Sequence, residues 1–251
     1  AYASCNFLSR VNDMGSMDNQ NVVVIGGTSG IGLATAITAA SKGARVWAVS
    51  RSEDKVKACS DSYPEITFSS LDTHNVEGLK SLFESVGAID HIVAAATGAE
   101  RTMAPFMDQT DEQFRAAFDK FWGYTHVARQ GIPHLNETGS LTFISGTPAR
   151  KCNPGMSSVS CTGNAVEGLT RALALEVAPK RVNAVAPGLI STGMFDSLGD
   201  NKNAALANMG KNIPLGRVGE ADEVAKAIVM IMENSYITGT TIDVDGGVLL
   251  P

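Results

Sequence analysis

Ile25-Gly26-Gly27-Thr28-Ser29-Gly30-Ile31-Gly32 is the stretch of this chain that decides its fold. It follows the β-branched run Val22–Ile25 and opens a segment with helical periodicity, Ile31–Lys42. A glycine loop between a strand and a helix lets the backbone approach a pyrophosphate, and the helix N-terminus offers free N–H groups to the phosphates. The stretch therefore predicts a dinucleotide site at Gly26, Thr28, Ser29, Gly30 and Ile31.

Strands and helices alternate along the rest of the chain. Predicted strands cover 45–49, 66–71, 89–96, 140–145, 181–186 and 241–244, and predicted helices cover 76–86, 111–134, 158–178 and 221–232, with another starting at about residue 53. This alternation favours right-handed βαβ units around a buried parallel sheet. We predict an α/β fold with one Rossmann-type domain over 17–251, a doubly wound parallel sheet with helices on both faces. The polar stretch Ser191–Asn212 is predicted to form a mobile flap over a site.

Residues 1–16 have a different character from the remainder of the chain. They lack periodicity, and Gly15-Ser16-Met17 is typical of a cloning junction before an initiator methionine. We predict that they are an expression-derived tail, with a native extension as the alternative.

Composition excludes several classes of function. The 251 residues are 44% hydrophobic and carry a net charge of -6, which argues against a nucleic-acid or anionic-membrane surface. No apolar run approaches the length of a membrane span. Four cysteines lack both CxxC spacing and histidine partners at zinc spacing, so they predict reduced thiols in a cytoplasmic protein and no metal site. These are Cys5, Cys59, Cys152 and Cys161.

The end of the second predicted strand indicates which dinucleotide binds. An acidic residue at this place would bond the ribose 2′-hydroxyl. Here the sequence is Ser50-Arg51-Ser52, and an arginine can pair with a 2′-phosphate in a charge-assisted contact. We predict NADP(H) rather than NAD(H), with these three residues at the 2′ position. An exposed surface arginine is the alternative.

These motifs together resemble the short-chain dehydrogenase/reductase family, from Asn21 to Pro251. The glycine loop matches the family's TGxxxGxG with Ile25 in place of the threonine, Arg181–Thr192 is similar to the signature that follows a late strand, and Ile237–Gly247 matches the C-terminal signature. The resemblance implies an NADP(H)-dependent oxidoreductase. It also implies further cofactor residues, of which Asp72 would bond the adenine: Asp72, Thr73, Ala95, Ala96, Pro187, Gly188, Ile190 and Thr192.

The resemblance fails at the catalytic positions. The family uses a tyrosine to move a proton and a lysine four residues later to lower its pKa, and these positions hold Val159 and Gly163. The family's serine position falls on Gly146, one residue after Ser145, and its asparagine position is Lys120. Valine cannot move a proton, and glycine has no charge with which to activate a neighbour. The sequence therefore predicts an atypical active site.

Three residues are candidates for substitute catalytic groups. Lys120 and Tyr124 share one helical face and would form a permuted acid–base pair, and Ser145 could bond a substrate oxygen. The alternatives are a solvated or interface lysine, a packed tyrosine and a turn serine.

The functional alternatives stay open at this level. The first is an oxidoreductase with an unorthodox proton relay, acting on an unknown carbonyl or alcohol substrate. The second is a catalytically inactive NADP(H)-binding protein that senses cofactor or supports a partner subunit, and the third is a non-redox enzyme that reuses the fold. The resemblance also implies a homodimer or homotetramer built on helices 111–134 and 158–178, and neither nucleic acid nor membrane is an expected partner.

Overall fold

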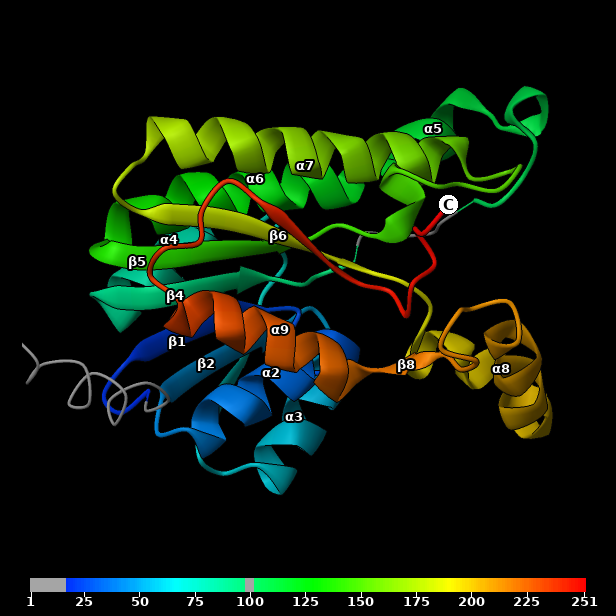
Figure 1. The fold of residues 1–251 in the computed structure, drawn as a ribbon. Coiled ribbons are helices and arrows are strands. Elements are labelled where there is room, and N and C mark those ends of the chain that lie inside the picture. Colours follow the sequence, from blue (N-terminus) through cyan, green and yellow to red (C-terminus); the bar gives the residue numbers. More distant parts are fainter. Residues whose placement is uncertain (1–16, 98–101) are drawn as a thin grey trace, which may run out of the picture.

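Seven parallel strands form the main sheet (Figure 1). The structure is a computed structural model and describes residues 17–97 and 102–251, so the predicted tail over 1–16 lies outside the described residues. From one edge to the other the strands are β3 (Ile66–Ser70), β2 (Arg45–Ser50), β1 (Asn21–Ile25), β4 (Ile89–Ala94), β5 (Leu135–Ile144), β6 (Arg181–Pro187) and β9 (Thr241–Val244). The order reverses between β1 and β4, which confirms the predicted doubly wound Rossmann-type sheet.

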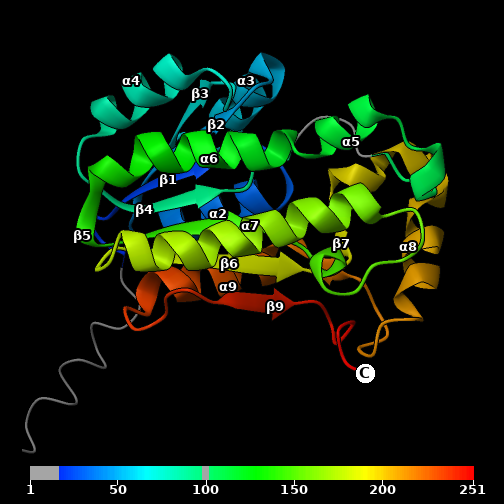
Figure 2. The same cartoon turned by 90° about the horizontal axis from the view of Figure 1, so that it is seen from above.

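Helices cover both faces of this sheet (Figures 1 and 2). One face carries α2 (Gly30–Ser41), α3 (Glu53–Ser62) and α9 (Ala221–Glu233). The other carries α4 (Val76–Val86), α6 (Asp119–Gly131) and α7 (Ser157–Glu176). Within the described ranges, none of the helices combines the length and the apolar composition that crossing a bilayer requires.

The central strand β1 explains why two helical layers are needed. Successive side chains of a strand point to opposite faces of the sheet. Val22 and Val24 pack in the core beneath α2 and α9, and Val23 and Ile25 pack in the core beneath α4, α6 and α7. All four are at most 1% exposed. A strand buried on both faces reads as an unbroken apolar run, as this one does.

The prediction of one continuous helix over 111–134 is wrong. The segment divides into α5 (Asp111–Ala117), α6 and the 3-10 turn η2 (Ile132–His134). Thr110 starts α5 with a capping box, and the N–H of Phe118 bonds to the carbonyl of Arg115, which tightens the turn at the end of this short helix. Apolar periodicity continues across such a tightened turn, so the pattern alone does not reveal the break.

The predicted flap over 191–212 contains regular structure. Short strand β7 (Ile190–Ser191) pairs with β8 (Gly219–Glu220), and between them lie the 3-10 segment η4 (Gly193–Asn201) and helix α8 (Lys202–Gly210). Helix α8 stands out from the body of the molecule beside the end of the sheet (Figure 1).

His91 is a buried titratable residue of β4. Its Nδ1 lies 2.8 Å from Oγ of Ser140 and its Nε2 lies 3.1 Å from Oε1 of Gln20. Burial, helped by the charge of Arg181 and opposed by that of Asp90, lowers the pKa of His91 to about 4. The folded protein therefore holds a neutral imidazole over a pH range in which the unfolded chain binds a proton.

We expect this histidine to make stability depend on pH. The unfolded state takes up the proton below the ordinary pKa of 6.5, and the folded state takes it up only near 4, so stability is lost as the pH falls between these values. The free energy of unfolding in urea should fall by about 2 kcal/mol between pH 7.5 and pH 5. His91→Gln replaces the ring nitrogens by an amide that still donates and accepts hydrogen bonds but does not titrate. It should flatten the dependence of the unfolding free energy on pH, and equal slopes in the two proteins would contradict the assignment.

Candidate cofactor site and active site

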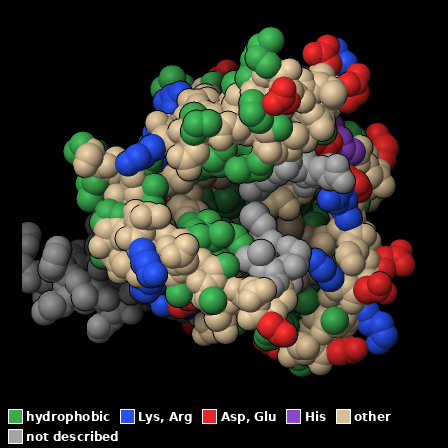
Figure 3. Space-filling view, turned by 90° about the vertical axis from the view of Figure 1, so that its right-hand side faces the viewer, with side chains coloured by type: hydrophobic (Ala, Val, Ile, Leu, Met, Phe, Trp, Pro, Cys, Tyr) green, Lys and Arg blue, Asp and Glu red, His purple; other side chains and the backbone are tan. Residues whose placement is uncertain are grey.

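The side of the molecule toward which the strands point in Figure 1 is hollowed, and apolar side chains are visible inside the hollow (Figure 3). In open α/β sheets ligands bind at the carboxyl ends of the strands, where the strand order reverses. The glycine loop follows β1, Arg51 follows β2, and the turn that starts at Pro187 ends β6. The fold therefore brings the three predicted cofactor segments to one side of the molecule.

Two glycines of the loop, Gly26 and Gly32, lie so close to backbone atoms that side chains cannot replace them. Gly26 has a φ of +88°, and a Cβ there would lie 2.5 Å from the backbone nitrogen of Ala96. A Cβ on Gly32 would overlap the carbonyl oxygen of Gly26. The N–H of Ala95 bonds to Ile25 at 2.8 Å, which joins the end of β4 to the start of the loop. The loop therefore presents backbone groups rather than side chains to a ligand.

The start of α2 faces the segment that follows β7. Ser29 occupies the N-cap position without using its side chain as a cap, and the N–H groups of Gly30 and Ile31 belong to the first helical turn, where helix geometry provides no acceptor. Gly30 has a φ of +51°, and a Cβ there would lie 3.3 Å from Cγ2 of Thr192. The free donors of the helix and the Thr192 side chain therefore lie beside one another, as a phosphate site requires.

Thr28 in the loop and the serines around Arg51 have local structural roles. Thr28 is 5% exposed, and its carbonyl accepts a hydrogen bond from Sγ of Cys59 at 3.5 Å. Ser50 ends β2, while the Ser52 hydroxyl accepts the N–H of Lys55 at 3.3 Å and so caps α3. Capping is a role for Ser52 that the sequence reasoning did not assign.

The turn after β6 carries the chain back over the sheet edge. Gly188 donates its N–H to Val244 at 3.0 Å, and a Cβ on Gly188 would lie 2.8 Å from Cα of Asp245. Ile190 is 8% exposed and lies in β7. Because Gly188 packs closely against Asp245, the segment from Pro187 to Thr192 runs on the side of the sheet where α2 begins.

Arg51 and Asp72 stand together at the rim of the site. Nη1 of Arg51 lies 4.0 Å from Oδ2 of Asp72, and both side chains are about half exposed. Burial by itself would raise the pKa of Asp72, but hydrogen bonds from His74 and the charge of Arg51 outweigh it and the pKa is lowered. The residue assigned to the 2′-phosphate and the one assigned to the adenine are therefore neighbours.

The structure gathers the three catalytic candidates at the end of β5. Nζ of Lys120 donates to the backbone carbonyl of Ser145 at 3.3 Å and lies 5.4 Å from the centre of the Tyr124 ring. That ring stacks on Phe143 at 5.4 Å between centroids, and Tyr124 is 1% exposed. Tyr124 is thus part of the core, whereas Lys120 is half-buried and reaches the strand end.

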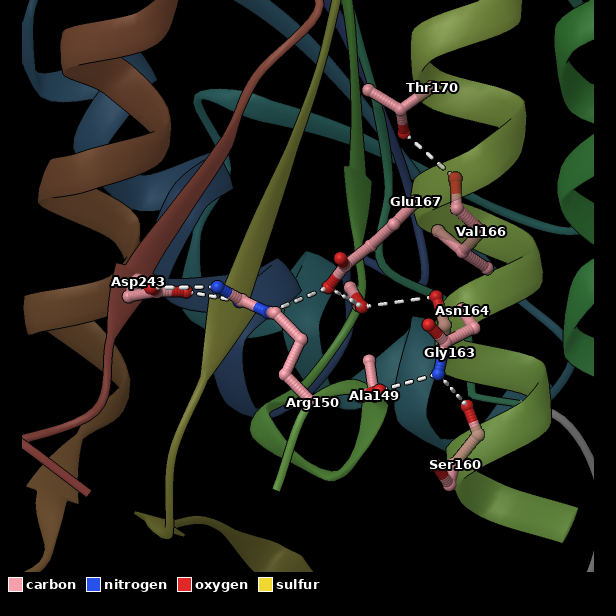
Figure 4. Close-up of polar contacts among 10 residues, drawn as sticks. Ala149, Arg150, Ser160, Gly163, Asn164, Val166, Glu167, Thr170 and Asp243 are labelled. Carbon is pink, nitrogen blue, oxygen red and sulfur yellow. Dashed lines mark hydrogen bonds and ion pairs between the residues drawn. The ribbon is translucent and has the colours of Figure 1, made fainter. Parts of the chain in front are cut away.

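A chain of polar contacts behind Ser145 was missed by the sequence reasoning (Figure 4). The Ser145 hydroxyl donates to Oε1 of Glu167 at 3.0 Å, and Nε of Arg150 lies 3.5 Å from the same oxygen. The guanidinium of Arg150 also makes two hydrogen bonds to the carboxylate of Asp243 on β9. These bonds and the charge of Glu167 raise the pKa of Arg150, so the cation persists at any ordinary pH. The contacts join β5, α7 and β9 beneath the predicted active site.

One signal in the sequence could have revealed Glu167. Val159, Gly163 and Glu167 are spaced four residues apart, so they lie on one face of α7. A carboxylate on the helix face that carries the expected catalytic positions indicates that a hydrogen-bond or ion-pair partner lies nearby. Its partners, Arg150 and Asp243, come from other elements and could not be assigned from spacing.

Comparison with known proteins places the whole arrangement in a family. The family model described as enoyl-(acyl carrier protein) reductase matches residues 26–249. A 3-oxoacyl-(acyl-carrier-protein) reductase of Rattus norvegicus is 35% identical over 235 residues, which cover 90% of this chain and 97% of the relative. A short-chain dehydrogenase/reductase of Stachybotrys chlorohalonatus is 32% identical over 255 residues, covering 94% of this chain and 100% of the relative. This chain belongs to the short-chain dehydrogenase/reductase family.

Solved structures of short-chain dehydrogenases agree with the fold. A small-chain dehydrogenase in complex with NADPH is 34% identical, with a TM-score of 0.79 over 93% of this chain and 100% of the other. An NADPH-bound short-chain oxidoreductase from Pseudomonas aeruginosa, described as containing an atypical catalytic center, is 28% identical, with a TM-score of 0.86 over 93% of this chain and 99% of the other.

The position that the family resemblance assigns to lysine is closed in this short-chain dehydrogenase/reductase. Gly163 is buried, and a Cβ there would lie 2.9 Å from Cβ of Ala149 in the 3-10 turn η3 (Thr147–Ala149). Asn164 donates its amide to the carbonyl of Ala149 and so ties the turn to α7 (Figure 4). Val159, one helical turn earlier, is half-buried. Space for a side chain at position 163 is therefore taken by the turn.

We expect Gly163→Ala to destabilise the protein because its methyl group must displace Ala149. Overpacking of this kind costs about 1–3 kcal/mol, which urea unfolding would measure. Gly168→Ala is a matched control on the same helix, because a Cβ there meets no atom within 4 Å. The control should gain about 0.5–1 kcal/mol from helix propensity. Equal effects of the two substitutions would contradict the packing argument.

Proposed function

We propose that this chain is an NADP(H)-binding oxidoreductase with an atypical active site, acting on a carbonyl or alcohol substrate. The observation that carries the proposal is that Gly30 and Thr192 lie beside one another at the carboxyl ends of the strands, on the side of the sheet where Arg51 follows β2. The NADPH complexes of two short-chain dehydrogenases with this fold support the choice of cofactor. Membership of the family supports the class of reaction.

The residues present fit a dinucleotide phosphate. A nicotinamide cofactor bound in this hollow supplies or accepts a hydride. The first turn of α2 would hold the pyrophosphate through backbone N–H groups, with Thr192 beside it. Arg51 would pair with the 2′-phosphate, and Asp72 would accept a hydrogen bond from the adenine.

A proton donor has to come from the chain's own groups at the end of β5. Lys120 is our proposed donor, because its ammonium group already bonds to the backbone at Ser145. The Ser145 hydroxyl is held by Glu167, which makes Ser145 a fixed anchor for a substrate oxygen rather than a source of protons. The ring of the buried Tyr124 lies 5.4 Å from the same ammonium nitrogen.

We expect NADPH to bind more tightly than NADH, because Arg51 contributes a charge-assisted contact that NADH cannot use. Loss of one such contact costs about 1.5–3 kcal/mol. Titration by intrinsic fluorescence should therefore find that Arg51→Ala weakens NADPH and leaves NADH nearly unchanged. Lys57→Ala is a matched control, since Lys57 is exposed and pairs with Asp61 within α3. Equal affinity of the unmodified protein for the two cofactors would overturn the proposal.

The closed position at Gly163 favours a second candidate, a catalytically inactive NADP(H)-binding protein. The turn η3 leaves no room for an activating side chain there, and Val159 cannot move a proton. Binding of NADPH without turnover of any carbonyl compound would favour this reading over the first.

We also propose a homodimer or homotetramer. Helices α6 and α7 lie side by side on one face (Figures 1 and 2), and they present Trp122 and Leu175 with 54% and 84% of their surface exposed. The family resemblance, which implies an assembly built on these two helices, supports the proposal. A second copy of the chain is the occupant we assign to this face.

A further inference from the structure

The loop that carries Asp72 is fastened to α6 by a histidine. Oδ1 of Asp72 accepts the backbone N–H of His74 at 2.8 Å, and Nδ1 of the same residue lies 3.2 Å away. On its other side the ring reaches the first residue of α6, with Nε2 of His74 3.0 Å from Oδ1 of Asp119. One imidazole thus lies between two carboxylates from separate elements.

Neighbouring contacts fix the position of this ring. His126 of α6 packs edge-on against His74 at 5.4 Å between ring centres, and its Nδ1 lies 3.1 Å from the carbonyl of Thr73. Thr73 can pack closely against α6 because position 123 is a glycine, and a Cβ there would lie 2.5 Å from Oγ1 of Thr73. The backbone over 72–74 is therefore held against α6 at several points, and His74 is not free to swing away.

The two oxygens of Asp72 have different partners. Oδ1 is held by His74, whereas Oδ2 faces Arg51 at 4.0 Å, a separation longer than a hydrogen bond. Without the ring contact Oδ1 keeps only the backbone N–H of residue 74, and the carboxylate can rotate about that bond so that Oδ2 approaches Arg51. That closer pair would neutralise the charge on which a 2′-phosphate depends.

We propose that His74 is a specificity-determining positioning residue that keeps Asp72 from pairing closely with Arg51 and so preserves the preference for NADPH. The proposal rests on the proposed cofactor site. The charged and titratable groups around the ring are Asp72 on its own loop, Asp119 and His126 on α6, and Arg51 beyond Asp72. The effect requires the 2′-phosphate, so NADH binding should be nearly insensitive to it.

The test is the ratio of NADPH to NADH affinity in His74→Phe, measured by fluorescence titration. Phenylalanine keeps an aromatic ring beside His126 and Gly123 but removes both ring nitrogens. A half-exposed ion pair contributes up to about fivefold in affinity, so the ratio should fall about three- to fivefold. The same substitution in an Asp72→Asn background should leave the ratio unchanged, because the competing carboxylate is gone.

Two further variants separate positioning from general support. His126→Phe removes a clamp on Thr73 without touching the carboxylate of Asp72, and its ratio should equal that of the unmodified protein. His74→Gln retains an N–H donor and should recover part of the loss. An equal weakening of both cofactors in His74→Phe would overturn the proposal and reduce His74 to a structural residue. Failure of the unmodified protein to bind NADPH would instead overturn the proposed function itself.

Discussion

Restoring the tyrosine and the lysine should speed NADPH oxidation with simple aldehydes and ketones by about 10²–10⁴-fold, the typical contribution of general acid–base assistance, if the chain has no proton donor of its own. The gain should be far smaller if Lys120 already donates the proton. Val159 and Gly163 stand where the family resemblance places the tyrosine and the lysine. The structure adds that a lysine at 163 needs Ala149 reduced to glycine as well. The variant to make is therefore Val159→Tyr with Gly163→Lys and Ala149→Gly.

A matched control isolates the hydroxyl group in that experiment. The same three-site protein with Val159→Phe has an aromatic ring of nearly the same shape and no proton to give. Steady-state absorbance of NADPH should find a gain only in the tyrosine version. If the unmodified protein already matches the tyrosine version, a native donor exists, and Lys120→Met should abolish the activity.

Arg150→Met should cost about 3 kcal/mol of unfolding free energy, because it leaves the carboxylate of Glu167 buried without its cation. The Glu167 side chain is 7% exposed, and its Oε1 keeps the Ser145 hydroxyl at 3.0 Å. One neutral donor does not replace a guanidinium for a buried anion. Denaturant unfolding at neutral pH measures the loss directly.

Two further variants test whether the loss of stability comes from the buried charge of Glu167. Arg115→Met removes an equivalent side chain from an exposed pair with Asp111, and it should change stability by less than about 0.5 kcal/mol. Adding Glu167→Gln to Arg150→Met removes the stranded charge and should restore part of the loss. Similar effects of the two arginine substitutions would show that the contacts behind Ser145 contribute no more than a surface ion pair.

The strand, loop and helix around β1 could be predicted from the sequence because their signals are local. The apolar run of β1, the glycines of the loop and the onset of α2 lie within one short stretch, and the fold bears out that order. Arg51 was assigned in the same way, from its place at a strand end, and the structure places it directly after β2. The helix over 111–134 was misread because the tightened turn at Phe118 preserves the periodicity on which the prediction relied.

The sequence by itself determined the fold class, the glycine loop and the absence of a tyrosine and a lysine at positions 159 and 163, since each depends on residue identity and local spacing. Only the tertiary structure decided that Ala149 fills the space beside Gly163 and that Glu167 meets Arg150 and Ser145. Arg150 and Asp243 are 93 residues apart, and they meet because β9 lies beside β6 at the edge of the sheet. Such contacts depend on how whole elements pack against one another, and no periodicity along the chain records that packing.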